Sequence, residues 1–368
     1  MSDTDKLKPL EQEFSRQEES LKSIIFAGFG KQINLNSQKQ LLEALQNCFK
    51  SQRLSIENTN RETLASLAPK SPIFRWIMDY RKVSKNVQFI KSLSQHVHPV
   101  TGRIHPEYKQ LGAVTGRFSC CNPNLQQVPR NKLFRECVRP APGHKMVIAD
   151  YSQIDLRVAA EISQDSRMIE AYNQGQDLHK LTASLIKEKA LNEVSEIERQ
   201  LAKAVNFGLI YAMGAKSLQI YAQSAYGVTM TEQQAEDFRR KFFNAYQGLK
   251  AWHEIERMST QRETRTLLGR RRLWQDDPEL TQVLNAPVQG TGADIIKKAL
   301  VMLPDALIDM DVKIISCVHD EIILEAPEDK AQQAAQILKE VMEKAGQEYL
   351  KTVPVVAETS IVDSWAGK

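Results

Sequence analysis

Two apolar strand patterns lie far apart in the chain, and each runs directly into an aspartate. Lys145–Ala149 (KMVIA) has the composition of a short buried strand and is followed at once by Asp150. A second pair of patterns, Val312–Val318 and Ile322–Ala326, is interrupted only by a polar turn with Asp320 at its tip. If these strands are neighbours in one sheet, the two carboxylates meet at its edge. The chain is therefore restricted to folds in which distant segments share a sheet.

The first stretch of the chain, to about Leu93, has apolar residues at helical spacing. Asn36 or Ser37 is placed to cap a second helix, and Ser71-Pro72 is placed to open a third. We therefore expect a helical subdomain here. No residue types with catalytic potential recur in it at a useful spacing.

The remaining pattern is helical almost throughout from about Ser163 to Arg262. After the hairpin, the sequence predicts a helix from Pro327 to Tyr349 and a strand from Val353 to Ala357. Strands on both sides of a helical insertion indicate an α+β domain interrupted by a helical one.

Composition excludes several classes of protein without selecting one. The 368 residues are 42% hydrophobic and 26% charged, which excludes a wholly disordered chain, and no apolar run reaches the roughly 18–20 residues of a membrane span. Five cysteines without a CxxC pair favour a reducing cytosol over a disulfide framework or zinc site. The net charge of +4 permits a nucleic-acid partner but does not require one.

The aspartates at the two strand ends suggest a metal site. Two carboxylates together with substrate phosphates suit Mg²⁺, which prefers hard oxygen ligands, and two such ions can clamp an in-line phosphoryl displacement. A structural alternative stays open for each segment. Ser152-x-x-Asp155 resembles a helix capping box, and His319-Asp320-Glu321 resembles an ordinary polar turn.

A candidate phosphate-binding helix lies in the helical insertion. Arg199, Lys203, Phe207 and Tyr211 recur every four residues, so on a continuous helix they form one slowly drifting stripe. Two cations followed by two aromatics can grip a triphosphate and stack its base. Gly208 would let a planar group approach the backbone closely. The alternative is an amphipathic helix with its aromatics in the core and its cations in solvent.

Polar loops supply a third set of candidates. Thr115-Gly-Arg117-Phe-Ser119 and Pro123-Asn-Leu-Gln126 offer donors suited to phosphates and to minor-groove base acceptors. The basic run Gly269-Arg-Arg-Arg272 could follow a nucleic-acid backbone, or it could be a solvated face.

Taken together, these segments resemble family A DNA polymerases, the class of bacterial DNA polymerase I. The likeness extends over about Asn34 to Trp365. It rests on five motifs in order and at matching spacing: Asp150–Arg157 (DYSQIDLR), the Arg199–Tyr211 helix, Val318–Glu321 (VHDE), Thr115–Gln126 (TGR…PNLQ) and Asn285–Thr291 (NAPVQGT).

The resemblance implies a right-hand polymerase fold, with an antiparallel-sheet palm. Residues 1–93 would form a reduced helical thumb, 94–162 and 275–368 the palm, and 163–274 the helical fingers. It also implies a template-directed DNA polymerase, a nucleotidyltransferase that adds dNTPs to the 3′ end of a primer–template DNA. We expect a monomer that acts on DNA in the cytoplasm, with a partner protein where processivity is needed.

The resemblance also assigns roles to individual residues. Asp150, Asp320 and the carbonyl of Tyr151 would hold two Mg²⁺ ions, Lys203 would donate a proton to departing pyrophosphate, and Glu321 would support the site. Contacts to the dNTP fall on Gln153, Asp155, His179, Arg199, Lys203, Phe207 and Tyr211. Contacts to DNA fall on Arg117, Asn124, Gln126, Asn285, Gln289 and His319.

One departure from the family pattern concerns sugar selection. Asp155 stands where the family usually has a glutamate that blocks a ribose 2′-hydroxyl, so we expect weaker exclusion of ribonucleotides. The chain is also expected to be too short to include a proofreading domain. Two alternatives remain, a single-subunit RNA polymerase and a non-catalytic DNA-binding subunit derived from a polymerase. The acidic side chain at position 155 disfavours the first, and retention of Asp150 and Asp320 disfavours the second.

Overall fold

The computed structural model describes residues 4–129 and 131–368. Within it the chain divides into two units. One comprises the residues up to 107 together with 121–139 and 364–366, and the other comprises 108–120, 140–363 and 367–368. The two short strands β1 (Glu107–Lys109) and β2 (Ser119–Cys121) lie where the chain passes from one unit to the other.

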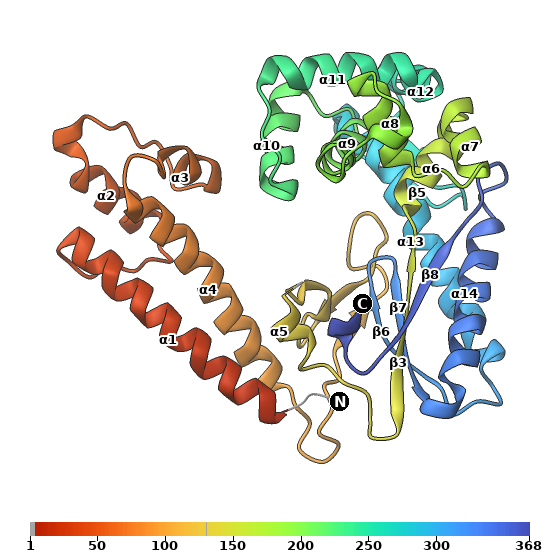
Figure 1. Ribbon diagram of the computed structural model, residues 1–368, viewed down its shortest axis with the longest axis horizontal. Coiled ribbons are helices and arrows are strands. Elements are labelled where there is room, and N and C mark those ends of the chain that lie inside the picture. Colours follow the sequence, from red (N-terminus) through yellow and green to blue (C-terminus); the bar gives the residue numbers. More distant parts are fainter. Residues whose placement is uncertain (1–3, 130) are drawn as a thin grey trace. The chain divides into compact units, whose positions relative to one another are not determined.

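The first unit is helical, as its apolar spacing predicts (Figure 1). Its longest helices, α1 (Thr4–Phe29) and α4 (Pro72–Gln95), pack against each other. Ser37 caps α2 by accepting a hydrogen bond from the Gln40 amide, and Pro72 occupies the first turn of α4, so both expected helix starts are confirmed. The other elements of this unit are α2 (Gln38–Cys48), η1 (Lys50–Gln52), α3 (Arg61–Leu67), η2 (Leu125–Gln127), α5 (Lys132–Arg135) and η5 (Trp365–Gly367), whose last residue belongs to the second unit.

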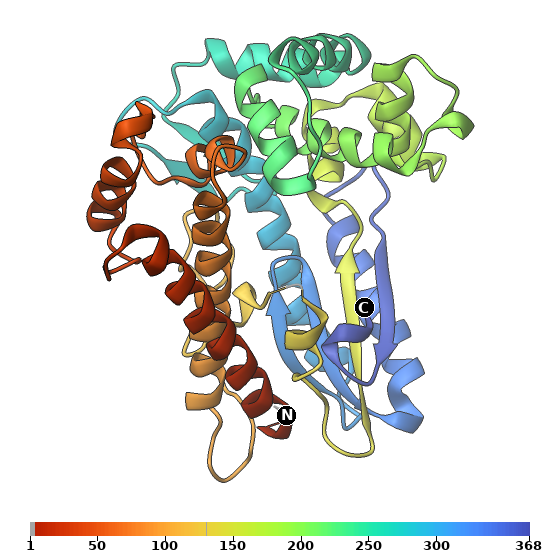
Figure 2. The same cartoon turned by 60° about the vertical axis from the view of Figure 1, so that its left-hand side comes forward.

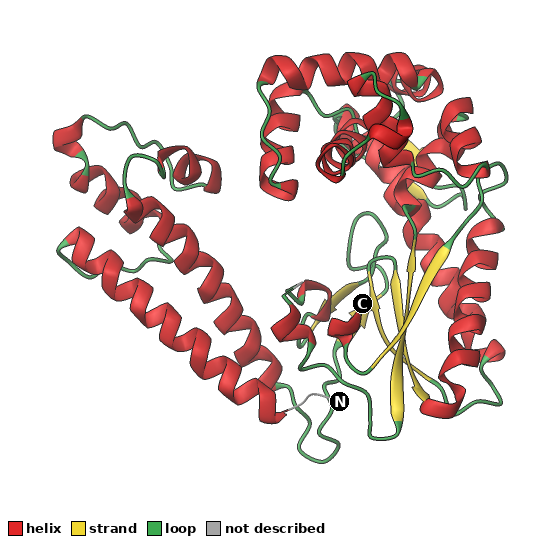
Figure 3. Ribbon diagram, viewed as in Figure 1, coloured by secondary structure: helices red, strands yellow, loops and turns green. Residues whose placement is uncertain are grey.

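The second unit is built on a four-stranded antiparallel sheet, drawn in yellow in Figure 3. Its strand order is β6 (Lys313–Val318), β7 (Glu321–Pro327), β3 (His144–Tyr151) and β8 (Ala357–Val362). The apolar side chains of β3 and β7 are buried, which explains why these two strands read as continuous hydrophobic runs. The expectation that the two aspartate-bearing patterns pair in one sheet is confirmed.

The predicted strand at Val353–Ala357 is wrong, because β8 begins only at Ala357. Val353 and Val355 are buried, but their backbone amides donate to the side chains of Glu161 and Gln347 rather than to a strand. The alternation of apolar residues therefore reflects packing, while the paired strand is the more polar segment that follows. Burial and strand pairing coincide in most sheets, but here they fall on adjacent segments.

One long helix packs directly on the sheet of the second unit, and another packs beside that helix. α14 (Ala331–Gln347) packs on β3 and β8, and α13 (Leu280–Ala306) packs beside α14, as the second view also shows (Figure 2). After α6 (Ile154–Ser163), the expected helical insertion is confirmed by six α-helices among the described residues: α7 (Ser166–Asn173), α8 (Leu178–Lys187), α9 (Glu196–Leu209), α10 (Ala215–Tyr226), α11 (Glu232–Ala245) and α12 (Gln247–Met258).

Three smaller elements complete the second unit. A hairpin of β4 (Glu263–Arg265) and β5 (Arg271–Leu273) follows the insertion, while η3 (Leu191–Glu193) and η4 (Glu328–Lys330) are single turns. Among the described residues, no helix is both long enough and apolar enough to cross a lipid bilayer.

Candidate active site

Asp150 and Asp320 meet at one edge of the sheet. In the antiparallel pairing of β3 with β7, Asp150 lies opposite Glu321, and the Tyr151 amide donates to the Asp320 carbonyl at 3.3 Å. His319 and Asp320 form the two-residue turn between β6 and β7, and His319 adopts a left-handed backbone with φ of +57°. Strand register therefore brings together carboxylates that are far apart in the sequence.

This edge carries a concentration of negative charge. Burial and the charges of Asp150 and Asp155 together raise the pKa of Asp320 to about 7. Oδ1 of Asp150 is buried without a hydrogen-bond partner among the described residues. The Lys368 ammonium partly neutralises the cluster, since it lies 2.6 Å from Asp150 Oδ2 and also contacts the Glu321 carboxylate. Sequence reasoning missed Lys368, because no local pattern links it to this edge.

The carboxylate cluster fits a divalent cation. Asp150 and Asp320 supply hard oxygen ligands, and the orphaned buried oxygen of Asp150 is an unused acceptor of the kind that a cation satisfies. No group of three or more His, Cys, Asp or Glu side chains with ligand spacing occurs in the described part of the chain. The protein groups available to a cation at this edge are thus the carboxylates of Asp150 and Asp320.

The capping-box alternative for Ser152 and Asp155 is not realised. α6 begins at Ile154, and its N-cap residue is Gln153, which has φ of +56° and makes no side-chain cap. The Asp155 carboxylate instead accepts a hydrogen bond from the Tyr211 hydroxyl at 3.1 Å and lies 3.5 Å from the Arg117 guanidinium. Burial raises the pKa of Asp155, while Arg117 and Tyr211 oppose the rise.

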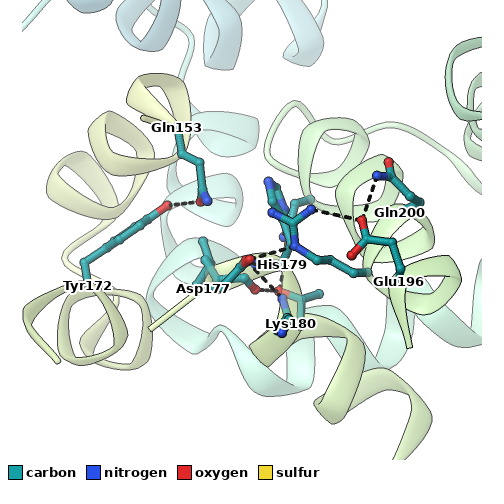
Figure 4. A network of polar contacts seen from close by, with 11 residues as sticks. Gln153, Tyr172, Asp177, His179, Lys180, Glu196 and Gln200 are labelled. Atoms are coloured by element: carbon teal, nitrogen blue, oxygen red, sulfur yellow. Dashed lines mark hydrogen bonds and ion pairs between the residues drawn. The ribbon is translucent and has the colours of Figure 1, made fainter. Parts of the chain in front are cut away.

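The two cations of the predicted stripe lie on α9. Asp177 Oδ2 accepts a hydrogen bond from Arg199 Nε at 2.7 Å, and Glu196 lies 3.3 Å from Arg199 Nη1 (Figure 4). The other Asp177 oxygen caps α8 by accepting from the amides of His179 and Lys180. Asp177 thus fixes Arg199 to the start of α8. Lys203 is half-buried one turn further along, and its charge lowers the pKa of the nearby His179.

His179 is a buried histidine that faces α9. Burial, opposed by the charge of Asp177 and assisted by those of Lys203 and Arg199, lowers the pKa of His179 to about 4, so the ring is neutral near pH 7. Its Nδ1 lies 2.8 Å from the Asn206 side-chain amide, and the Thr182 hydroxyl holds the other side of that amide. The ring also lies 5.7 Å from that of Phe207. Sequence reasoning did not single out Asn206, because this residue lies outside the stripe that runs from Arg199 to Tyr211.

Gln153 lies at the start of α6, between the sheet and the helical insertion. The Tyr172 hydroxyl donates to Gln153 Oε1 at 3.1 Å, as Figure 4 shows. Tyr172 is itself buried beneath the Arg157 guanidinium, which lies 4.3 Å from the ring centroid. The Gln153 side chain is therefore oriented by α7 rather than by its own helix.

Two details of the predicted stripe are wrong. α9 ends at Leu209, so Tyr211 lies in the following turn, from where it reaches Asp155 and a hydrogen bond from Gln289. A Cβ at Gly208 would lie 2.9 Å from the side chain of Leu218, so this glycine permits close packing of α9 on α10. It does not open the backbone to a planar ligand.

The remaining predicted DNA contacts fall into two groups. Arg117, Asn285, Gln289 and His319 all belong to the second unit, where Asn285 and Gln289 lie one turn apart on α13 and the charge of His319 acts on Asp155. Asn124 and Gln126 belong to the first unit, where Asn124 Oδ1 caps a short turn by accepting from the Gln126 amide at 3.1 Å.

The basic run at 269–272 is not uniformly solvated. Arg270 turns inward, with Nε 2.7 Å from Asp294 Oδ1. Arg271 pairs with Glu263, and Arg272 lies over the Trp274 ring with its guanidinium carbon 5.0 Å from the centroid. Each arginine of the run therefore has a protein partner.

Comparison with known proteins identifies, along nearly the whole chain, the family that the sequence motifs resemble. The family described as "DNA polymerase family A" matches residues 4–367. DNA polymerase I of Aquifex aeolicus is 39% identical over 84% of this chain, and the thermostable DNA polymerase I of Thermus aquaticus is 32% identical over 98%. This chain spans 53% and 45% of those two proteins, about half of their length.

A solved structure shares the fold. The polymerase domain of Pol1 from M. smegmatis, solved in complex with DNA primer-template and dNTP, superimposes with a TM-score of 0.89 at 29% identity. The match covers 100% of this chain and 67% of that chain, which confirms the expected right-hand polymerase fold. Family A polymerases generally use divalent metal ions. From the sheet-edge carboxylates, the matched motifs and these comparisons it follows that this chain belongs to DNA polymerase family A.

Proposed function

We propose that this chain is a DNA-directed DNA polymerase that transfers a nucleotide from a dNTP to a primer 3′-hydroxyl and releases pyrophosphate. The observation that carries the proposal is the convergence of Asp150 and Asp320 at the tip of paired strands. Two Mg²⁺ ions, held by these carboxylates and the Tyr151 carbonyl, would activate the hydroxyl and neutralise developing charge when bound. The proposal rests on family membership together with this local arrangement.

The dNTP is proposed to lie against α9 and the start of α6. Arg199 and Lys203 bind its triphosphate, and neutral His179 donates a hydrogen bond to it. Lys203 donates a proton to the departing pyrophosphate, which prevents charge from accumulating on the leaving group. Phe207 packs beside the base and Tyr211 lies at the templating position, while Gln153 and Asp155 contact the nucleotide. Support comes from the shared half-buried face of Arg199, Lys203 and Phe207.

Primer–template DNA is the proposed second substrate. Arg117, Gln289 and Asn285 would contact minor-groove acceptors, whose positions are similar for all base pairs, so that correct geometry is sensed without reading sequence. His319 would lie near the primer terminus, with Asn124 and Gln126 as further DNA contacts and Glu321 in support of the metal carboxylates. We also propose the thumb (1–93), palm (94–162 and 275–368) and fingers (163–274) assignments given above.

The biological setting is also a proposal. Work in the cytoplasm fits a chain that has five cysteines without a CxxC pair. A monomeric state and a partner protein for processivity stay predictions. The lack of proofreading stays a prediction for these 368 residues.

A primer-extension assay tests the function. The chain should extend a primer with dNTPs in Mg²⁺, and Asp320→Ala should lose activity by at least about 10³-fold while it retains primer–template affinity. Asp311→Ala, an exposed aspartate near the start of β6, is the control and should extend at the wild-type rate. Wild-type DNA binding without extension would favour the non-catalytic alternative, and a preference for rNTPs would favour an RNA polymerase.

A further inference from the structure

Arg270 makes three side-chain contacts with two other segments of the second unit, α13 and the loop that contains Thr115. Its Nε lies 2.7 Å from Asp294 Oδ1 on α13, and its Nη2 donates to the carbonyl of Thr115 at 2.8 Å and to that of Gly290 at 3.1 Å. Asp294 is 7% exposed, so this ion pair is largely shielded from water. A guanidinium presents several donors in a fixed plane, and a lysine could not make this set of contacts simultaneously.

The backbone of Arg270 is also fixed. Its amide donates to Thr266 Oγ1 at 3.1 Å and its carbonyl accepts from the Thr266 amide at 3.0 Å, which closes the turn between β4 and β5. The same turn is held on α13, because the Leu267 amide donates to the buried Thr291 hydroxyl at 3.0 Å. The guanidinium therefore extends from a rigid support.

Two glycines make room for the guanidinium. A Cβ at Gly116, where φ is +83°, would lie 2.4 Å from the guanidinium carbon of Arg270. A Cβ at Gly290 would lie 2.9 Å from Nη2. The left-handed backbone at Gly116 favours glycine, and the missing side chain at Gly290 leaves space for the guanidinium where the loop, the hairpin and α13 meet.

The loop that Arg270 holds carries Arg117. Thr115, whose carbonyl Arg270 binds, lies two residues before Arg117, and Arg117 Nη2 lies 3.5 Å from Asp155 Oδ2. A second anchor holds the chain just before this loop, where Lys297 Nζ donates to the Gln110 carbonyl at 2.7 Å. Arg270 therefore holds the backbone just before Arg117, while Lys297 also lies over the Phe118 ring on the other side, 5.2 Å from its centroid.

We propose that Arg270 is a positioning residue of the polymerase, which holds the 113–117 loop so that Arg117 faces Asp155 and the DNA minor groove. The effect of Arg270 on primer extension rests on the proposed function, but its anchoring of the loop can be measured without an activity assay. It differs from two simpler roles, a direct contact of Arg270 with DNA phosphate and a purely structural ion pair with Asp294. Arg270 acts through Arg117 and does not touch the substrate.

Hydrogen exchange of the free protein tests the anchor. In Arg270→Lys, which keeps a positive charge beside Asp294, amides of residues 113–117 should exchange at least about tenfold faster than in the wild type. Arg265→Ala is the matched control, because Arg265 is an exposed arginine of the same hairpin whose Nε lies 2.7 Å from the half-buried Glu263. Unchanged exchange in Arg270→Lys would overturn the proposal whether or not the chain is a polymerase.

A double-mutant cycle tests the route through Arg117. Displacing a positioned group by about 1 Å can cost up to about 100-fold in rate, so Arg270→Lys should lower kcat/KM for extension by tenfold or more. The double variant Arg270→Lys/Arg117→Ala should be no slower than Arg117→Ala alone. Multiplicative losses would overturn the proposal and leave the polymerase function intact.

A modified template separates positioning from phosphate contact. Replacing a minor-groove purine N3 acceptor by carbon (3-deaza) should slow the wild type, but it should not slow Arg117→Ala or Arg270→Lys further. If Arg270→Lys keeps the full wild-type sensitivity to this change, Arg270 does not act through Arg117. Arg265→Ala should behave as the wild type throughout.

Discussion

The Tyr211 hydroxyl donates a hydrogen bond to Asp155 Oδ2 at 3.1 Å, across the turn that follows α9. The shorter acidic side chain at position 155 therefore still reaches the tyrosine, even though the family usually has glutamate there. Oδ1 of Asp155 is buried without a hydrogen-bond partner among the described residues, and it would lie 3.5 Å from a Cβ at Gly292.

Asp155→Glu should strengthen exclusion of ribonucleotides. The added methylene would fill space beside the sugar, and one methylene in such a pocket discriminates by about 10-fold or more. We expect the ratio of kcat/KM for dNTP to that for rNTP to rise by this factor in steady-state single-nucleotide incorporation. A variant with unchanged selectivity and unchanged dNTP kinetics would show that position 155 does not limit sugar choice here.

Asp177→Asn should weaken dNTP binding. The amide can still cap α8, but it loses the charge that holds Arg199 at 2.7 Å. Loss of one charge-assisted hydrogen bond corresponds to a roughly tenfold loss of affinity. We therefore expect the KM for dNTP to rise roughly tenfold, with little change in kcat. Glu196→Gln is the control, since Glu196 is more exposed and lies 3.3 Å from Arg199. Equal KM values for both variants would contradict the positioning role of Asp177.

Stability should fall in mild acid because of two buried histidines. Burial lowers the pKa of His179 and of His253 to about 4, and His253 Nε2 donates to the Ile210 carbonyl at 3.1 Å. The unfolded chain, with histidine pKa values near 6.5, binds more protons than the folded chain between pH 6.5 and 4. The free energy of unfolding therefore decreases as pH falls through this window, by up to about 1.4 kcal/mol per pH unit for each histidine.

Urea unfolding at several pH values between 6.5 and 5 measures this slope. His253→Gln keeps a donor for Ile210 and should reduce the slope by the contribution of one histidine. The double variant His179→Gln/His253→Gln should reduce the slope by the contributions of both histidines. If the double variant retains the wild-type slope, other groups control acid stability.

Lys368→Ala should tighten binding of divalent cations to the free protein. The Lys368 ammonium contacts Asp150 Oδ2 at 2.6 Å, so a cation that binds this oxygen must displace it. For a partly exposed ion pair, we expect roughly three- to tenfold tighter Mn²⁺ binding by calorimetric titration without nucleotide. Lys313→Ala, which removes an exposed lysine 3.5 Å from Asp311, should bind Mn²⁺ as the wild type does. A weaker affinity in Lys368→Ala would mean that Lys368 supports the cation site.

Local sequence predicted the elements that depend on nearby residues. The Ser37 cap, the Pro72 start of α4 and the strand that carries Asp150 near its end follow from capping and periodicity, which act over a few residues. Predictions failed where two local causes give the same pattern. Buried valines at 353 and 355 resemble a strand, although side chains satisfy their amides.

The candidate site shows the same division. Four-residue spacing correctly places Arg199, Lys203 and Phe207 along α9, but it cannot indicate that the helix ends before Tyr211. Nor does any local pattern link Lys368 to Asp150, or Arg270 to the Thr115 carbonyl. These contacts join segments that only the folded chain brings together.

The sequence by itself determined the family, the strand ends that carry Asp150 and Asp320, and the helix that carries the two cations. These features are encoded by residue type and spacing, which fix the direction of a side chain on its own element. Only the tertiary structure decided which groups share each acceptor: Tyr211 and Arg117 at Asp155, Lys368 at Asp150, and Arg270 at the loop before Arg117. The physical reason is that a hydrogen bond depends on the position of both partners, and packing of distant segments sets the second one.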